Sequence, residues 1–476
     1  MILRNAHPAS LLSLCIALSF VLSACSTVPP PQATKIEANA AFKEIALWKE
    51  VRPATTKPQD VPDQWWTLFN DTTLNDLQAQ VLVSNETLKN NLAQIAIAQA
   101  ALNVSQAALL PTVGSSTSVT RSRASNPSNA PIANPTNSAV LQLTASWEAD
   151  LWGRLGGAVD NTQARYQASR ADLAAAHLSI ASTLAQTYFA ARAAQEQVAV
   201  LTTTVKAYER SLQLTRNRYT AGVVSAADVA QAVTQLKSTE VQRLESRTTA
   251  AQLEHAIAVL VGKAPADFSL ADGKLPTALP IVPEFFPATV LTRRPDIAAA
   301  QLRVAAANAQ IGVASAAFFP ALTFNGSGGY RGPRLADFLS APALFWSLGP
   351  ALALTVFDGG ARQANINSAG GSAAQAAAVY RQAVLVAFQE VEDNLVLGAN
   401  LRTELGLQQE ALVAAKRSLE ITENQYQAGT VAYTNVVAAQ ITALASERSL
   451  LDIRNRELAA LNILLKNIAG RFEVKA

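Results

Sequence analysis

Few side chains in this sequence have the types and spacing that catalysis or metal binding requires. Of the three histidines, His7 lies in the apolar N-terminal segment, and His177 and His255 stand singly in helical patterns. There is no His-Glu-x-x-His metal motif and no glycine-bounded nucleophilic serine. Gly262-Lys263 lacks the preceding glycine of a phosphate loop. We therefore predict no catalytic residue, no metal site and no cofactor.

Both cysteines lie close to the N-terminus. Cys15 and Cys25 are the only two, so the rest of the chain holds no disulfide framework. The apolar run from Leu11 to Leu22 is shorter than the ~20 residues of a membrane-spanning helix and is typical of a secretory signal peptide. It ends in Leu22-Ser23-Ala24-Cys25, which resembles the bacterial lipobox. We predict a lipoprotein signal peptide over residues 1–24 and lipid attachment at Cys25. A plain signal peptide with an incidental cysteine is the alternative.

The residues after this cysteine are rich in proline and predict an extended tether over residues 25–64. Ser26, rather than an aspartate, follows the cysteine, and by analogy with lipoprotein sorting this favours the outer membrane. The predicted location is therefore the outer membrane of a Gram-negative bacterium. The protein would be anchored in the lipid there and extend into the periplasm.

The composition excludes several classes of protein. Of 476 residues, 50% are hydrophobic and 15% are charged, against roughly 25% charged in a typical soluble domain. This hydrophobic content and a net charge of only +3 exclude a disordered chain. The 38 basic residues are matched by 35 acidic ones without a basic block, so nucleic acid is not a predicted partner. After the N-terminal segment, no apolar run is long enough for a membrane helix.

The two halves of the chain repeat the same features. Residues 210–224 align with residues 417–431 at an offset of 207, with nine of fifteen positions identical. Each half is expected to contain a helix, two strands, a very long helix, a glycine turn and another long helix. We predict two tandem structural repeats, over residues 65–262 and 291–470, joined by an equatorial linker over residues 263–290 and followed by a tail over residues 471–476.

The long helices carry a residue pattern that repeats every seven positions, which is typical of a supercoiled seam. No proline interrupts residues 153–217, which as a helix would extend roughly 95 Å. An ordinary coiled-coil stalk has the same period and is the alternative. The rows are Val159, Tyr166, Leu173, Ile180, Thr187, Ala194, Leu201 and Tyr208; His177, Leu184, Ala191, Val198, Val205, Leu212 and Tyr219; and Val384, Val391, Gly398, Leu405, Leu412, Leu419 and Tyr426.

Four segments of about ten residues have the length of tilted transmembrane strands. Residues 141–148, 322–330 and 346–356 alternate large apolar with small or polar residues, and residues 112–121 do so weakly. A soluble, half-buried sheet has the same alternation and is the alternative. Four strands cannot close a barrel, because about eight is the smallest closed number, and an open edge is unfavourable in lipid. We predict an α+β membrane protein in which three chains form one twelve-stranded β-barrel that continues into a periplasmic α-helical barrel.

Several motifs occur along the chain in one specific order. They are Trp65-Trp66, residues 291–297 (LTRRPDI), 307–314 and 318–320, Phe357-Asp358-Gly359-Gly360, residues 387–393, and residues 426–431 (YQAGTV). Together they resemble the TolC-type outer-membrane factor family, in particular its NodT-like lipoprotein branch. The resemblance covers essentially the whole mature chain. It implies a homotrimer that docks to a periplasmic adaptor protein and an inner-membrane resistance-nodulation-division pump.

The resemblance also implies a role for the two glycine turns. The Tyr-x-x-Gly tip motif of the family matches Tyr219 with Gly222 and Tyr426 with Gly429, which assigns these residues to adaptor docking. Each glycine follows a heptad helix, as a left-handed C-terminal cap would. A purely structural hairpin turn is therefore the alternative.

A regulated aperture is expected near these turns, at Asp228, Tyr426, Asn435 and Ala438. Asp228 is predicted to reach Tyr426 in the closed state, since Asn435 takes the matching place in the second half. Ser225 and Asp228 also form a Ser-x-x-Asp capping pattern, which by itself explains the acid. Many relatives carry an acid where this chain has Ala438, so its constriction is predicted to be less cation-selective.

The predicted function is a passive exit duct in the outer membrane, without catalysis. It would conduct small molecules such as drugs from the adaptor and the pump to the exterior, with energy supplied by the pump. Two alternatives remain at this stage. One is the outer-membrane component of a type I protein secretion system, and the other is a lipid-anchored coiled-coil scaffold without a pore.

Overall fold

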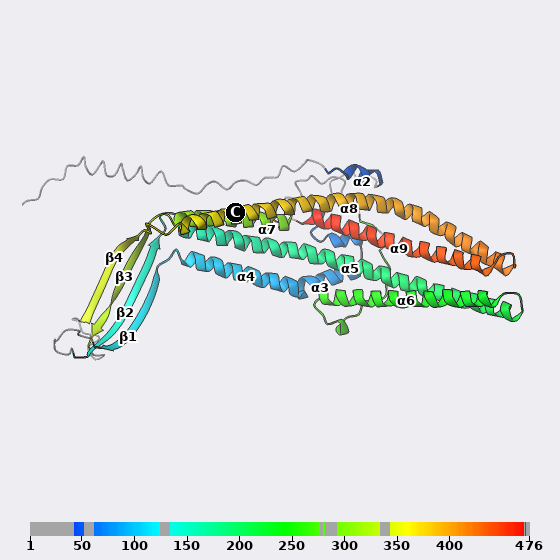
Figure 1. Ribbon diagram of the computed structural model, residues 1–476, viewed down its shortest axis with the longest axis horizontal. Coiled ribbons are helices and arrows are strands. Elements are labelled where there is room, and N and C mark those ends of the chain that lie inside the picture. The colour runs from blue at the N-terminus through cyan, green and yellow to red at the C-terminus, as the bar shows by residue number, and fades with distance from the viewer. Residues whose placement is uncertain are drawn as a thin grey trace, which may run out of the picture. The chain divides into compact units, whose positions relative to one another are not determined.

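The computed structural model describes residues 42–51, 61–123, 134–276, 279–280, 293–333, 343–470 and 472. The predicted signal peptide, Cys25 and most of the predicted tether and tail lie outside these residues. The elements are α2 (Ile45–Val51), η1 (Trp65–Phe69), α3 (Thr72–Ser84), α4 (Glu86–Ala107), β1 (Thr112–Ser122), β2 (Thr136–Ala149), α5 (Arg154–Thr220), α6 (Ala226–Leu260), η2 (Pro265–Asp267), α7 (Pro295–Ala316), β3 (Ala321–Gly332), β4 (Leu344–Ala353), α8 (Ala361–Gln427) and α9 (Tyr433–Ala469) (Figure 1).

The chain is mostly helical, with one small antiparallel sheet, and it divides into two compact units. The sheet unit comprises residues 95–169 and 300–380, and the helical unit comprises residues 36–94, 170–299 and 381–476. In both halves of the chain a helix is followed by two strands, a very long helix and a shorter one, but the first half has an additional helix, α3, before these. Within the described ranges, no helix has both the length and the apolar character needed to cross a membrane.

The four strands follow one another across the sheet in the order β1-β2-β3-β4 (Figure 1). Paired residues on neighbouring strands project to the same side, so the register defines two faces. The apolar face carries Leu141, Leu143, Trp147, Phe324, Tyr330, Leu344, Trp346, Leu348 and Leu352. The polar face carries Ser116, Gln142, Thr144, Ser146, Asn325, Ser327 and Ser347. The predicted alternation is therefore confirmed.

The bounds of one strand differ from the prediction. The segment predicted over residues 346–356 ends as a strand at Ala353. Ala353 pairs with Ala321, the first residue of β3. Pro320, which precedes Ala321, has no backbone N–H and cannot extend the pairing by a donor. Leu354 therefore has no partner on β3. The weak segment at residues 112–121 is a full strand, Thr112–Ser122, because it pairs along its whole length with β2.

Three glycines of β3 lie inside the sheet. Gly326, Gly328 and Gly329 all pair with both neighbouring strands. A Cβ atom at Gly329 would collide with the carbonyl oxygen of Leu141. The close approach of β2 to β3 therefore requires glycine at this position.

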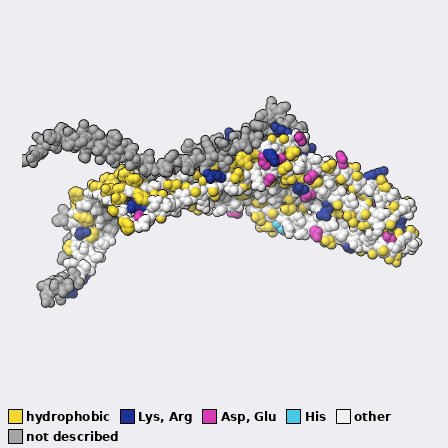
Figure 2. All heavy atoms as spheres, turned by 45° about the horizontal axis from the view of Figure 1, so that its top comes forward, with side chains coloured by type: hydrophobic (Ala, Val, Ile, Leu, Met, Phe, Trp, Pro, Cys, Tyr) yellow, Lys and Arg dark blue, Asp and Glu magenta, His cyan; other side chains and the backbone are white. Residues whose placement is uncertain are grey.

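The predicted heptad seam is confirmed over the central part of α5. Leu184, Leu201 and Val205 are at most 2% exposed, as expected for residues that pack between helices. Tyr219, the last residue of the row that contains Leu184 and Val205, is 49% exposed and no longer packs between helices. Figure 2 shows charged side chains of both signs scattered among uncharged ones on the face in view.

A polar network fixes η1 in the core of the helical unit. Trp65, which is fully buried, donates from its indole nitrogen to the side-chain oxygen of Asn462 at 3.0 Å. The Asn462 amide nitrogen donates in turn to the backbone oxygen and hydroxyl of Ser182, at 3.1 and 2.8 Å. Because every member has a partner, the network stabilises one arrangement of η1, α5 and α9.

The short helix α2 is fastened to α8 within the helical unit. Two backbone N–H groups that precede the helix donate to the Glu392 carboxylate, at 2.7 and 3.0 Å. Trp48, 1% exposed, covers Gly398, where a Cβ would lie 2.6 Å from the indole ring. The glycine in this heptad row therefore makes room for a tryptophan of α2. This helix lies inside residues 25–64, so the prediction of an extended tether is wrong at Ile45–Val51.

A buried arginine joins the start of α7 to α8 and α9. Arg294 pairs with Asp296 at 2.8 Å and with Glu390 at 3.1 Å, and it donates to Asn467 at 3.0 Å. Burial raises the pKa of Asp296, but the hydrogen bonds and charge of Arg294 outweigh it and hold that pKa below its usual value. The Asp296 carboxylate therefore stays ionised and keeps its ion pair with Arg294, which holds the start of α7 against α8 and α9.

Candidate functional site

The turn between α5 and α6 and the turn between α8 and α9 share one backbone geometry. Gly222 and Gly429 have φ values of +72° and +77°, in the left-handed region. The Gly222 N–H donates to the Tyr219 carbonyl, and the Val223 N–H donates to the Arg218 carbonyl, both at 2.9 Å. In the second turn, the Gly429 N–H donates to the Tyr426 carbonyl and the Thr430 N–H donates to the Gln425 carbonyl, both at 3.0 Å. The predicted left-handed caps are confirmed, and glycine is required because other residues are strained at such φ values.

Asp228 caps the start of α6. Its carboxylate accepts from the Ser225 backbone N–H at 2.9 Å and from the Ser225 hydroxyl at 2.8 Å, while its own N–H donates back to that hydroxyl at 3.2 Å. The Tyr426 hydroxyl donates instead to Thr215, at 3.5 Å. The predicted bond from Asp228 to Tyr426 is thus wrong for the described chain, because the local capping box occupies the acid.

The other two predicted aperture residues lie in the first turns of α9. Asn435 and Ala438 are both exposed, and the Asn435 backbone N–H donates to Ala432 at 3.1 Å. Ala432 precedes α9 without a side-chain cap. The second turn therefore lacks the capping box of the first turn, as the sequence difference at these positions indicates.

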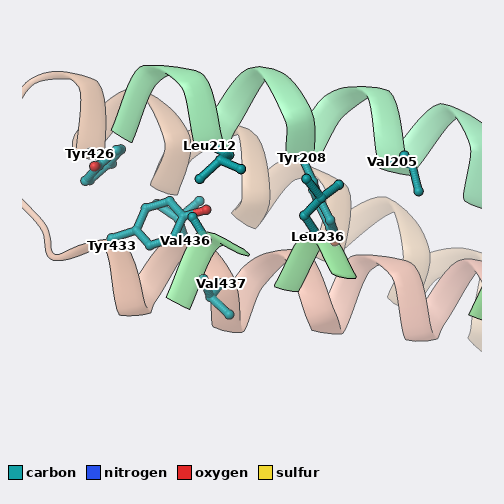
Figure 3. Packing of buried hydrophobic residues seen from close by; sticks show 9 residues of the cluster. Val205, Tyr208, Leu212, Leu236, Tyr426, Tyr433, Val436 and Val437 are labelled. Atoms are coloured by element: carbon teal, nitrogen blue, oxygen red, sulfur yellow. The ribbon is translucent and has the colours of Figure 1, made fainter. Parts of the chain in front are cut away.

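A hydrophobic cluster behind the turns packs the two hairpins side by side (Figure 3). Tyr426 and Tyr433 are 5% and 2% exposed, and their ring centroids lie 5.2 Å apart. The cluster takes residues from all four helices, α5, α6, α8 and α9. Its members are Val205, Tyr208, Leu212, Ala232, Leu236, Tyr426, Tyr433, Val436 and Val437.

The tyrosine hydroxyls in this cluster have polar partners on α5 and α6. The Tyr433 hydroxyl lies 3.3 Å from the Ser211 hydroxyl. Burial raises the pKa of Tyr208 to about 12, an effect that its hydrogen bond with Gln235 only partly offsets. Burial also raises the pKa of Tyr433. Both side chains therefore stay neutral at any physiological pH, and the seam is held by neutral hydrogen bonds and ring packing.

Arg218 makes two hydrogen bonds from the first hairpin to the second. Its Nη1 donates to the Tyr426 carbonyl at 2.6 Å and its Nη2 donates to the Gln427 carbonyl. The guanidinium also lies 4.7 Å from the centroid of the Tyr426 ring. These carbonyls belong to the last turn of α8, where a cation is favourable, and the Tyr426 carbonyl also accepts from the Gly429 N–H at 3.0 Å. We call this set of contacts the Arg218 clamp.

Sequence reasoning did not single out Arg218. The matching residue of the second half is Gln425, so the repeat comparison gave no reason to select it. The only available signal was a basic residue in the last turn of a helix, next to the tip motif. No group of three or more His, Cys, Asp or Glu side chains in the described ranges could hold a metal ion.

A four-stranded sheet with one apolar face, in the same chain as long helical hairpins, indicates a channel protein of the outer membrane. Comparison with known proteins agrees with this class. The chain belongs to the outer membrane efflux protein family, whose model matches residues 77–263 and 286–470. The resemblance inferred from the motifs is confirmed.

Individual relatives are similar over almost their whole length. The toluene efflux pump outer membrane protein TtgF of Pseudomonas putida is 28% identical over 470 residues, which cover 97% of each chain. The probable outer membrane lipoprotein SilC of Salmonella typhimurium is 26% identical over 467 residues, 94% of this chain and 96% of SilC.

A solved structure of the outer-membrane channel OprN matches the fold with a TM-score of 0.86. It is 27% identical and covers 93% of this chain and 99% of its own. The protein is therefore an outer-membrane efflux channel protein of a Gram-negative bacterium and not an enzyme. The predictions of an outer-membrane location and of an efflux function are confirmed.

Proposed function

We propose that three copies of this chain form one channel in the outer membrane. The observation that carries the proposal is that the sheet is open at both edges while its apolar face is exposed. Trp346 and Leu348 on the edge strand β4 are 78% and 76% exposed, and the residues of β1 are exposed throughout. Unpaired edges are unfavourable in lipid, so β4 of one copy would pair with β1 of the next and close a twelve-stranded barrel.

The arrangement supports passive conduction. The hydroxyl and amide side chains of the polar face would line the lumen, and the apolar face would contact the lipid. The paired hairpins of three copies would continue the barrel as a helical tunnel. Small molecules such as drugs would enter at the tips from a periplasmic adaptor and an inner-membrane resistance-nodulation-division pump, which supplies the energy. The Arg218 clamp and the tyrosine cluster would hold the tunnel closed at rest.

Purified full-length protein tests this function directly. We expect chemical crosslinking to give trimers, and planar bilayers containing them to show stepwise ionic currents. Leu348→Lys should prevent membrane assembly, because a lysine facing lipid costs about 2–4 kcal/mol at the bilayer midplane. Ser347→Lys, one residue away on the polar face, should assemble normally. Monomers without current, or equal tolerance of the two lysines, would contradict the proposal.

The lipid anchor predicted at Cys25 gives a separate prediction. Cys25→Ser should abolish metabolic labelling by a radioactive fatty acid and block normal removal of the signal peptide, because the thiol is the acceptor of the lipid. Cys15→Ser is the matched control, since this thiol lies inside the apolar run and should be dispensable. Labelled mature protein from the Cys25→Ser variant would show that the lipid is attached elsewhere.

A further inference from the structure

The polar face of the sheet is almost free of charge. The four strands contain three charged residues, Arg121, Glu148 and Arg331. The register places Glu148 and Arg331 on the polar face and Arg121 on the apolar one. Glu148 lies at the helix end of its strand and pairs with Arg154 at 2.7 Å. Arg331 is therefore the one cation on the polar face of the described strands, and no carboxylate of these strands neutralises it.

Arg331 lies at the end of the sheet that is remote from the helices. β3 follows α7, and Arg331 is its penultimate residue, next to the connection that leads to β4. Its guanidinium lies 5.3 Å from the centroid of the Phe345 ring. Phe345 pairs with Gly329, which has no side chain on this face, so the ring has room there. The cation–π contact keeps the charge on the polar face.

We infer that Arg331 is a charge-selecting residue at the exit of the channel and that it attracts anionic groups, such as the carboxylates or sulfonates of organic anions. The inference rests on the proposed function, in which the polar face lines the lumen and the remote end of the sheet opens to the exterior. Three copies would then place three Arg331 side chains in one ring. Phe345 adds an aromatic surface beside each guanidinium.

The expected electrostatic effect is large enough to measure. Ser118 of β1 shares a rung of the sheet with Val140 and Arg331, two strand spacings away. This separation is on the order of 10 Å. At low ionic strength, one unit charge at that distance should change the ratio of local anion to cation concentration roughly threefold.

A single thiol on this rung provides the measurement. The sequence has no cysteine after Cys25, so Ser118→Cys would be the one unmodified thiol of an acylated mature chain. We would compare its reaction rates with a sulfonate-bearing and a trimethylammonium-bearing methanethiosulfonate reagent in purified trimers. Arg331→Gln should lower the anion-to-cation rate ratio roughly threefold in about 10 mM salt, and the difference should vanish in about 1 M salt. Arg331→Lys, which keeps the charge, should retain most of the ratio.

Arg121→Gln is the matched control. It removes the same type of side chain from the same end of the sheet but from the apolar face, where the side chain points away from the Ser118→Cys thiol, so the rate ratio should change less than with Arg331→Gln. An unchanged ratio for Arg331→Gln in intact trimers, or an equal change for Arg121→Gln, would overturn the inference while leaving the channel itself in place. Failure of the proposed function would show up differently, as the absence of trimers or of bilayer current.

Discussion

Trimers carrying Arg218→Gln should conduct several-fold more current than unmodified trimers at the same voltage. Arg218 holds the end of α8 through two charged hydrogen bonds to main-chain carbonyls and through the Tyr426 ring. Its side chain is only partly buried, so we take the lower end of the range for such bonds, about 1.5 kcal/mol per protomer. Losing that amount raises the population of an open hairpin about tenfold. Single-channel recording in planar bilayers measures the change.

Three further variants separate the Arg218 clamp from other roles of the tip. Asp228→Ala removes a helix cap worth about 1 kcal/mol but no contact between hairpins, so the current should stay close to that of the unmodified channel. Tyr426→Phe keeps the ring and loses only a 3.5 Å hydroxyl contact, so it should also have little effect. Arg216→Gln, at an exposed position of the same helix, controls for lost charge. If Asp228→Ala opened the channel as much as Arg218→Gln, the clamp would not be the main latch.

The long helices and strands could be predicted because they obey simple periodicities. The helix expected without a break over residues 153–217 is α5, Arg154–Thr220, since no proline interrupts a strict heptad. The two faces of β2 and β3 could be predicted in the same way, because side chains alternate between the faces of a strand. The end of β4 could not be read from alternation, because the apolar pattern continues to Val356 while the pairing stops where β3 begins.

The glycine turns were predictable and the Arg218 clamp was not, and the difference is physical. A left-handed cap restricts the residue at one position, so Gly222 and Gly429 are visible in the sequence. Every residue has a main-chain carbonyl, and it can accept from any arginine that reaches it. The residue type at Gln427 therefore does not indicate which arginine donates to its carbonyl. Asp228 had a local partner three residues away, and a short-range capping box forms at a smaller entropic cost than a contact between hairpins.

Gly222→Leu and Gly429→Leu should each abolish most efflux while trimers form at normal levels. We propose that the exposed turns dock to the adaptor protein, and a leucine would hold the two surfaces apart. A clash worth about 1.4 kcal/mol weakens such binding roughly tenfold. Among the described residues, nothing lies within 4 Å of a Cβ at either position, so the internal cost there is the strain of a positive φ. Drug susceptibility of cells, with trimer abundance measured in parallel, gives the result.

Gly153→Leu distinguishes docking from strain. Gly153 has a φ of +71° and likewise has nothing within 4 Å of its added Cβ, but it precedes α5 at the end next to the sheet. The backbone strain of this variant therefore matches that of the tip variants, while the tips themselves stay unchanged. We expect Gly153→Leu to retain efflux in proportion to its trimer level. If it lost as much efflux as Gly222→Leu, or if the tip variants lost efflux only as far as their trimers were depleted, the glycines would be structural turns and the adaptor would bind elsewhere.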